Sequence, residues 1–131
     1  MLTPHDGEYA RLAGRPPSAD RVASAQHLAG QLGVIVLLKG PLTAVASGDG
    51  SAPDVLLAAA GVPALATAGT GGVLSGIIGA FLARGIDPHR AAALAAHVHG
   101  RAAADGPDQG LVAGDLPGLV ASYLSRCGPD A

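Results

Sequence analysis

The run Val34-Ile35-Val36-Leu37-Leu38 places the strongest constraint on the fold of this chain. Such an unbroken apolar run, rich in β-branched residues, has no polar face. It is typical of a β-strand that other layers cover on both sides. A tight turn over residues 39–42 leads to a second strand-like run at residues 43–47, which ends in Gly48-Asp49-Gly50. The two runs predict a β-hairpin, which we expect at the side of a largely parallel sheet.

Helical patterns lie before and after this hairpin. The segment YARLAG predicts a short helix that Gly14 ends, and the next helix can be capped by Ser18 and ended by Gly33. Later helices are predicted from Val73 to Gly85, from Asp87-Pro88 through the two histidines that follow, and over residues 116–124. The predicted apolar face of the second helix comprises Val22, Ala25, Ala29 and Leu32.

These elements predict an α/β domain, a single one over residues 1–131, with helices on the faces of a small sheet. Hydrophobic residues form 49% of the chain but aromatic residues only 2%, so Ala, Val, Leu and Ile must build the core. Two or three predicted strands are few for this number of helices. Met1-Leu2-Thr3-Pro4 has the character of the last part of a further strand.

Composition argues against several functional classes. The formal net charge is −2, Lys39 is the only lysine, and the arginines are scattered, which disfavours a nucleic-acid-binding surface. Cys127 has no partner for a disulfide, which fits a cytoplasmic, reducing compartment. The longest uncharged run, residues 55–82, is interrupted by glycines and Pro63, so we predict neither a signal peptide nor a membrane span.

A glycine-rich turn, Ala68-Gly69-Thr70-Gly71-Gly72-Val73, enters a predicted helix. Free backbone N–H groups and the positive end of a helix dipole at such a turn favour an anion, most naturally a phosphate. Glycines at a helix start also serve close packing, and that alternative stays open. The turn matches neither a Walker A loop nor a dinucleotide fingerprint.

Lys39 and the histidines are the other candidates. Lys39 follows the most strand-like segment, where ligands of open α/β sheets gather, although a solvated turn lysine has the same pattern. His5 can contact a ligand or cap the short helix. His97 and His99 are two residues apart, which is the wrong spacing for joint metal ligation, so we predict structural or packing roles for both.

The ordered stretches LTPHDGEYARLAG, VLLKGPLTAVAS, ATAGTGGVLSGIIGAFLARG, DPHRAAALAAHVHGRAA and LVAGDLPGLV together resemble the later part of the ADP/ATP-dependent NAD(P)H-hydrate dehydratases. These are nucleotide-repair enzymes with a ribokinase-like fold. The resemblance implies a three-layer α/β/α domain whose sheet is incomplete, because the first part of the family domain is not matched. TPHDGE and the HGRA stretch resemble the dehydratases more closely than the sugar or vitamin kinases of the same fold.

The resemblance also implies an activity. The family dehydrates the S epimer of hydrated NADH or NADPH with ADP or ATP as co-substrate: the nucleotide phosphorylates the hydrate's hydroxyl, and elimination of phosphate restores the ring. Mg²⁺ offsets phosphate charge in such transfers. No metal-ligating side chain is assigned in this chain.

The resemblance also implies site residues, each taken from the position that matches the family pattern. His5 matches a residue that contacts the hydrate. The segment matching the adenine-nucleotide site is Lys39, Gly40, Pro41, Leu42 and Thr43, and the anion-binding turn is Gly69, Thr70 and Gly71. Gly72 stands where the family pattern GTGDVLSG has an aspartate that acts as base on the substrate hydroxyl. Glycine accepts no proton, so we predict an impaired chemical step.

Two hypotheses of different class follow. In the first, the chain is a diverged or partial dehydratase that binds adenine nucleotide and has weak turnover unless a complementary domain half is supplied. In the second, it is a non-catalytic nucleotide-binding or docking module that uses an exposed sheet edge, or assembles as a homo-oligomer. Gly72 favours the second hypothesis. The rest of the glycine-rich turn, Lys39 and His5 favour the first.

Overall fold

The computed structural model describes residues 1–128. Its elements in chain order are α1 (Asp6–Ala13), α2 (Arg21–Leu32), β1 (Val36–Leu38), β2 (Thr43–Ala46), β3 (Leu56–Ala58), the 3-10 helix η1 (Pro63–Ala66), α3 (Thr70–Ala83), α4 (Pro88–Ala104), the 3-10 helix η2 (Ala113–Asp115) and α5 (Leu116–Arg126). Within the described residues, no helix is both long enough and apolar enough to cross a membrane.

The three strands form an antiparallel sheet in the order β1-β2-β3. The predicted hairpin is confirmed, with Val36 opposite Ala46 and Leu38 opposite Ala44. The expectation of a largely parallel sheet is wrong for residues 1–128, where parallel pairing is confined to a bridge between Leu2 and Val36. That bridge confirms the strand-like character of the N-terminal residues: the Leu2 amide donates to the Ile35 carbonyl at 2.9 Å.

Strand β3 was not predicted. It pairs along β2, with Thr43 opposite Ala58 and Val45 opposite Leu56. Its run of Leu and Ala lacks the β-branched residues that mark a strand, and it is only three residues long. Leu57 is 51% exposed at this edge of the sheet, so tertiary pairing rather than local propensity makes it a strand.

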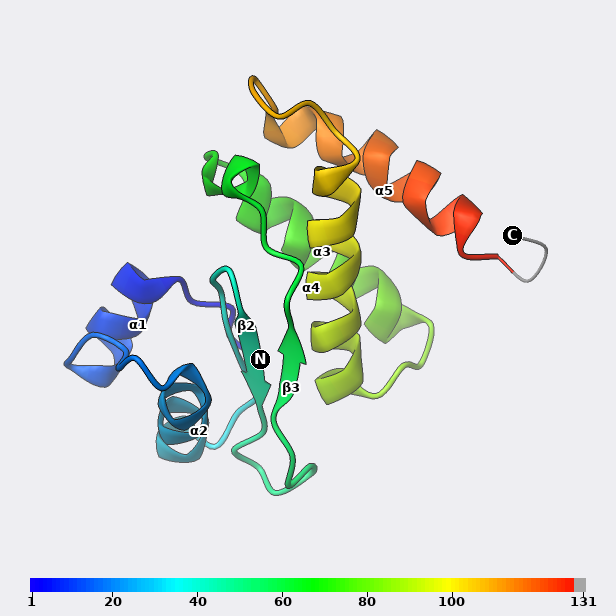
Figure 1. The fold of residues 1–131 in the computed structure, drawn as a ribbon. Coiled ribbons are helices and arrows are strands. Elements are labelled where there is room, and N and C mark those ends of the chain that lie inside the picture. Colours follow the sequence, from blue (N-terminus) through cyan, green and yellow to red (C-terminus); the bar gives the residue numbers. More distant parts are fainter. Residues whose placement is uncertain (129–131) are drawn as a thin grey trace.

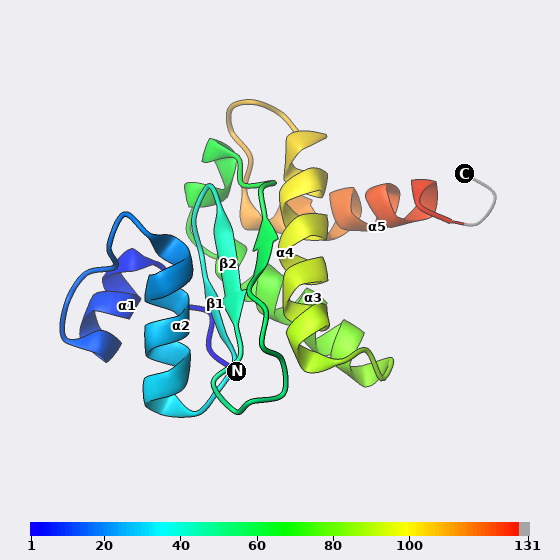
Figure 2. The same ribbon diagram turned by 60° about the horizontal axis from the view of Figure 1, so that its bottom comes forward.

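Helices cover both faces of the sheet, which confirms the predicted three-layer α/β/α arrangement (Figures 1 and 2). Helices α1 and α2 lie on one side of the strands, and α3 and α4 lie on the other. Helix α5 packs against α4 on the side away from the sheet. The apolar run at residues 34–38 is therefore enclosed from both sides, as its lack of a polar face requires.

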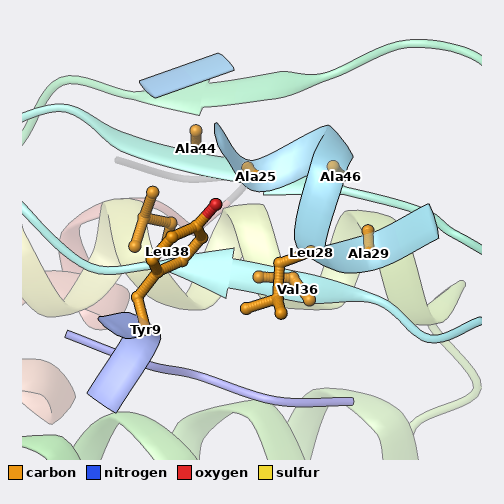
Figure 3. Close-up of a cluster of buried hydrophobic side chains, with 8 residues drawn as sticks. All are labelled: Tyr9, Ala25, Leu28, Ala29, Val36, Leu38, Ala44 and Ala46. Carbon is orange, nitrogen blue, oxygen red and sulfur yellow. The ribbon is translucent and has the colours of Figure 1, made fainter. Parts of the chain in front are cut away.

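Side chains alternate between two apolar cores along the paired strands. Val36 and Leu38 pack with α1 and α2, whereas Leu37 packs with α3 and α4. Figure 3 shows the first cluster, in which Tyr9 of α1 and Leu28 of α2 meet the alanines of β2. The Tyr9 hydroxyl donates to the Ser24 carbonyl at 3.0 Å, so its polar end is satisfied although the ring is buried.

Helix ends mostly follow their sequence signals. Gly14 and Gly33 end α1 and α2 in the left-handed conformation, at φ of 72° and 65°. Ser18 was wrongly predicted as the cap of α2: Asp20 caps this helix by accepting from the Ala23 amide, while the Ser18 hydroxyl donates to the Asp20 carbonyl. Asp87 caps α4 as predicted, through the Arg90 amide.

The predicted apolar face of α2 was partly wrong. Ala25 and Ala29 are buried as expected, but Leu32 is exposed and Leu28 supplies the large core side chain. Leu32 is the last residue of the helix, beside the Gly33 cap, where the chain leaves α2 for β1. Helix α3 also begins at Thr70, earlier than the predicted Val73.

Candidate functional site

A cavity of about 1030 Å³ lies at the carboxyl end of β1 and brings most of the predicted site residues together. Its wall includes His5, Lys39, Gly40, Pro41, Thr43, Gly69, Thr70, Gly71 and Gly72. Leu42 does not line the cavity. Segments from near the N-terminus, after β1 and before α3 thus converge on one hollow, at the strand end where ligands of α/β sheets bind.

His5 is both the cap of α1 and part of the cavity wall. Its Nδ1 accepts from the amides of Gly7 at 3.0 Å and Glu8 at 3.2 Å. Because Nδ1 acts as acceptor, the neutral ring carries its proton on Nε2. The two sequence interpretations of His5 are therefore compatible, since capping uses one ring nitrogen and leaves the other as a donor.

Lys39 forms an ion pair with Glu8, with 3.3 Å between Nζ and Oε2. The same Oε2 accepts from the His5 amide at 2.8 Å, completing a capping box. The pKa of Glu8 is lowered, first by this hydrogen bond and then by Lys39, against an opposing effect of burial. Sequence reasoning missed Glu8 as a cavity residue, although its spacing from His5 is that of a capping box.

The Lys39 side chain also reaches the start of α3. A Cβ atom added at Gly71 would lie 3.4 Å from Lys39 Nζ. The cation and the first turn of α3 therefore face the same part of the cavity. A lysine charge and the positive end of a helix dipole reinforce each other towards an anion.

Arg21 of α2 holds the turn that carries Lys39. Its guanidinium donates to the Lys39 carbonyl at 2.6 Å through Nη2 and to the Leu42 carbonyl at 3.2 Å through Nε. Nη2 also pairs with Asp6 at 3.1 Å. Leu42 thus contributes to the turn by its carbonyl rather than as a cavity residue. Nothing in the sequence pattern marked Arg21, because its partners, two backbone carbonyls and the Asp6 carboxylate, are distant in sequence.

The glycine-rich turn uses some of its amides internally. Gly69 has φ of 89°, a conformation that L side chains rarely adopt. The Thr70 amide donates to the Thr67 carbonyl at 3.4 Å and the Gly72 amide to the Gly69 carbonyl at 3.0 Å. The sequence predicted that this turn presents free N–H groups. Within residues 1–128, the Gly71 amide has no intramolecular acceptor.

Gly72 meets no structural demand for glycine. Its φ is not positive, and a Cβ atom added there would have no neighbour within 4 Å. An aspartate side chain at this position has open space beside the cavity. Among residues 1–128, Glu8 is the only carboxylate in the cavity wall, and it is engaged by Lys39 and the His5 amide.

The two predicted structural histidines differ in their surroundings. His97 is exposed and its Nε2 lies 3.2 Å from the Tyr123 hydroxyl. His99 lines the cavity and is only 6% exposed. Burial lowers the pKa of His99, with Lys39 acting in the same direction and the Thr70 backbone opposing. His99 therefore stays a neutral imidazole at neutral pH.

The side chains present do not form a magnesium site of their own. Residues 1–128 contain no group of three or more His, Cys, Asp or Glu side chains placed to hold a metal ion. Mg²⁺ is commonly bound by one or two carboxylates together with substrate phosphates. Glu8, the one carboxylate that the described residues place in the cavity wall, is already paired with Lys39.

Comparison with known proteins identifies relatives of this chain. The family model for NAD(P)H-hydrate dehydratase matches residues 1–126. The bifunctional NAD(P)H-hydrate repair enzyme Nnr of Mycobacterium leprae is 52% identical over 127 residues, covering 96% of this chain and 26% of that protein. The ADP-dependent (S)-NAD(P)H-hydrate dehydratase of Neisseria meningitidis serogroup B is 43% identical over 126 residues, covering 92% of this chain and 41% of that protein.

A solved structure shares the fold. The ADP/ATP-dependent NAD(P)H-hydrate dehydratase of Bacillus subtilis, co-crystallised with ATP and Mg²⁺, superposes with a TM-score of 0.86 at 32% identity. The match covers 97% of this chain and 48% of that one, so the chain spans half or less of the length of these relatives. The fold is ribokinase-like, as predicted. By sequence and by fold, the chain belongs to the NAD(P)H-hydrate dehydratase family.

Proposed function

We propose that this chain binds an adenine nucleotide in the cavity at the end of β1, for ADP- or ATP-dependent dehydration of the S epimer of NAD(P)H hydrate. The observation that carries the proposal is the convergence of His5, Lys39 and the first turn of α3 on one hollow. The relatives named for this reaction support the substrate class.

In this proposal the phosphates lie beside Lys39 and the Gly71 amide. Lys39 Nζ supplies the charge, and the start of α3 supplies the dipole. His5 offers its Nε2 proton to the hydrate, since its Nδ1 is committed to capping α1. In this proposal Mg²⁺ binds together with the nucleotide as the counter-ion of its phosphates, because the described residues offer no set of metal ligands in the cavity.

The chemical step is the weak part of this site. Gly72 stands at the position of the family's aspartate and offers no proton acceptor. Loss of a positioned general base lowers the rate by roughly a hundredfold to ten-thousandfold. Nucleotide binding does not depend on that carboxylate, and its absence removes a negative charge from beside the phosphates.

A second candidate is a non-catalytic nucleotide-binding module that docks on another chain. The open space at Gly72 favours it, because neither backbone conformation nor packing requires glycine there. The exposed Leu57 on the edge strand β3 is the docking element in this alternative. Both candidates share nucleotide binding, so turnover separates them.

Calorimetry with ADP and with ATP, each with Mg²⁺, tests the shared part. Lys39→Ala removes one charge from the cavity and is expected to weaken binding about tenfold to a hundredfold, the range for a hydrogen bond to a charged group. Arg15→Ala is the matched control, because it removes the same charge from an exposed loop outside the cavity. Equal affinity of the wild type and Lys39→Ala contradicts the proposal.

Turnover of hydrated NADH by Gly72→Asp tests the chemical step. The assay is run with and without the part of the family domain that the chain does not span, supplied as a separate chain. A gain over wild type is expected for a diverged dehydratase. Background turnover under both conditions, with ADP binding retained, identifies the non-catalytic module.

A further inference from the structure

His99 is a buried histidine whose ring nitrogen lacks a partner. Among the residues that the structure describes, no group forms a hydrogen bond with its Nε2, although the side chain is 6% exposed. His89 on the same helix shows the usual arrangement, because its Nε2 lies 2.9 Å from the Val45 carbonyl. Buried polar groups are normally paired, so an unpaired one is costly unless something else completes it.

The position of His99 shows what can complete it. His99 lies in the wall of the same cavity as Lys39 and Thr70. Besides burial, the charge of Lys39 lowers the pKa of its ring and the backbone of Thr70 raises it, so the imidazole is close to the cation and to the first turn of α3. The charge of Lys39 favours an anion, and a phosphate oxygen accepts hydrogen bonds from several donors at once.

We propose that His99 is a ligand-contacting residue of the cavity, donating from Nε2 to a phosphate group held between Lys39 and the start of α3. This inference rests on the proposed nucleotide-binding function. The neutral imidazole donates one hydrogen bond without adding a charge, so it fixes the phosphate's orientation while Lys39 provides the attraction. His99 thereby joins the site although its helix, α4, contributes none of the predicted binding residues.

The test compares His99→Leu with His97→Leu in the 131-residue chain. The two substitutions are chemically identical and lie on one helix, but His97 is exposed and outside the cavity. His99→Leu removes an unpaired buried nitrogen, so the melting temperature without ligand is expected to stay equal or rise. Its affinity for ADP is expected to fall about tenfold to a hundredfold, while His97→Leu stays within about twofold of wild type.

Three probes locate the contact: ADP, inorganic phosphate and adenosine. His99→Leu is expected to weaken the binding of ADP and of phosphate but not the binding of adenosine. His99→Gln, which keeps an N–H donor, is expected to recover part of the lost affinity. Equal losses for ADP and adenosine overturn the phosphate contact. A lower melting temperature with unchanged ADP affinity overturns it as well and assigns His99 to packing.

Failure of the proposed function has a different signature. If the wild type binds inorganic phosphate but not ADP, the nucleotide proposal fails, and weaker phosphate binding by His99→Leu still supports the contact. If the wild type binds ADP and His99→Leu binds it equally well, only the inference about His99 fails. Binding of neither ligand by the folded wild type overturns both.

Discussion

Lys39 Nζ lies 3.3 Å from Glu8 Oε2, so the only lysine of the chain is held by a carboxylate of α1. The same oxygen accepts the His5 amide and so belongs to the cap of that helix. Any anion that enters the cavity therefore meets Lys39 already paired. In the proposed anion site, affinity therefore depends on how strongly Glu8 competes for the cation.

Glu8→Gln is expected to strengthen ADP binding about twofold to fivefold, because it removes the competing charge of a half-exposed ion pair while glutamine keeps the capping hydrogen bond. Calorimetry at low and moderate salt measures the effect, which should shrink as salt screens the charges. Asp108→Asn, in an exposed loop outside the cavity, is the control. Weaker binding by Glu8→Gln contradicts competition.

The lowered pKa of Glu8 also predicts a pH dependence of stability. A carboxyl whose pKa is lower in the folded state stabilises the fold above its unfolded value, here 4.5, and loses that contribution as pH falls through the folded value. The melting temperature of wild type should therefore exceed that of Glu8→Gln at pH 7, and the difference should shrink below about pH 4.5. A constant difference down to pH 3 would falsify this assignment.

Arg21 positions the Lys39 turn by donating to two of its carbonyls. Arg21→Ala is expected to destabilise the fold by about 1–3 kcal/mol, because carbonyls of a partly buried turn lose their donor. ADP affinity should fall as well, because the turn carries Lys39. Urea denaturation and calorimetry measure the two effects. Arg15→Ala, outside any such contact, should stay within about 0.5 kcal/mol of wild type. An intact ADP affinity in Arg21→Ala shows that the turn holds its shape without the clamp.

Two helical glycines give opposite predictions. A Cβ at Gly100 would lie 2.1 Å from the Ala60 carbonyl oxygen, so Gly100→Ala must push α4 away from the segment after β3. We expect Gly100→Ala to lower the free energy of unfolding by about 3 kcal/mol. A Cβ atom added at Gly79 would meet no neighbour within 4 Å outside its own helix turn, so Gly79→Ala should stabilise α3 by about 0.5–1 kcal/mol. Urea denaturation compares the two, and similar effects for both would contradict the close approach at Gly100.

Gly72→Asp is expected to stabilise the fold by about 1 kcal/mol, apart from any change in activity. Aspartate is a better helix former than glycine, and its charge is favourable in the first turn of α3. Gly72→Asn separates the two contributions, since asparagine has nearly the shape and helix propensity of aspartate without its charge. If Gly72→Asp is no more stable than Gly72→Asn at neutral pH, the expected electrostatic contribution is absent.

Local signals predicted much of this chain correctly. The hairpin, the glycine ends of α1 and α2 and the Asp87 cap follow from residues within one turn of each feature. The resemblance identified the family, which the family model and the solved structure support. Two predictions were wrong, namely Ser18 as the cap of α2 and Leu32 as part of its buried face. Both residues lie close to a helix end, where a shift of one or two residues changes the cap and the buried face.

By itself the sequence determined the layers and the candidate residues, since apolar periodicity and turn chemistry are local properties. Tertiary structure alone decided which strand β3 joins, which carboxylate pairs with Lys39, and that Arg21 clamps its turn. It also decided that the ring of His97 is exposed and that of His99 is buried, although the two histidines have similar neighbours in the sequence. Contacts between residues far apart in the chain depend on how the layers pack, and no local pattern encodes them.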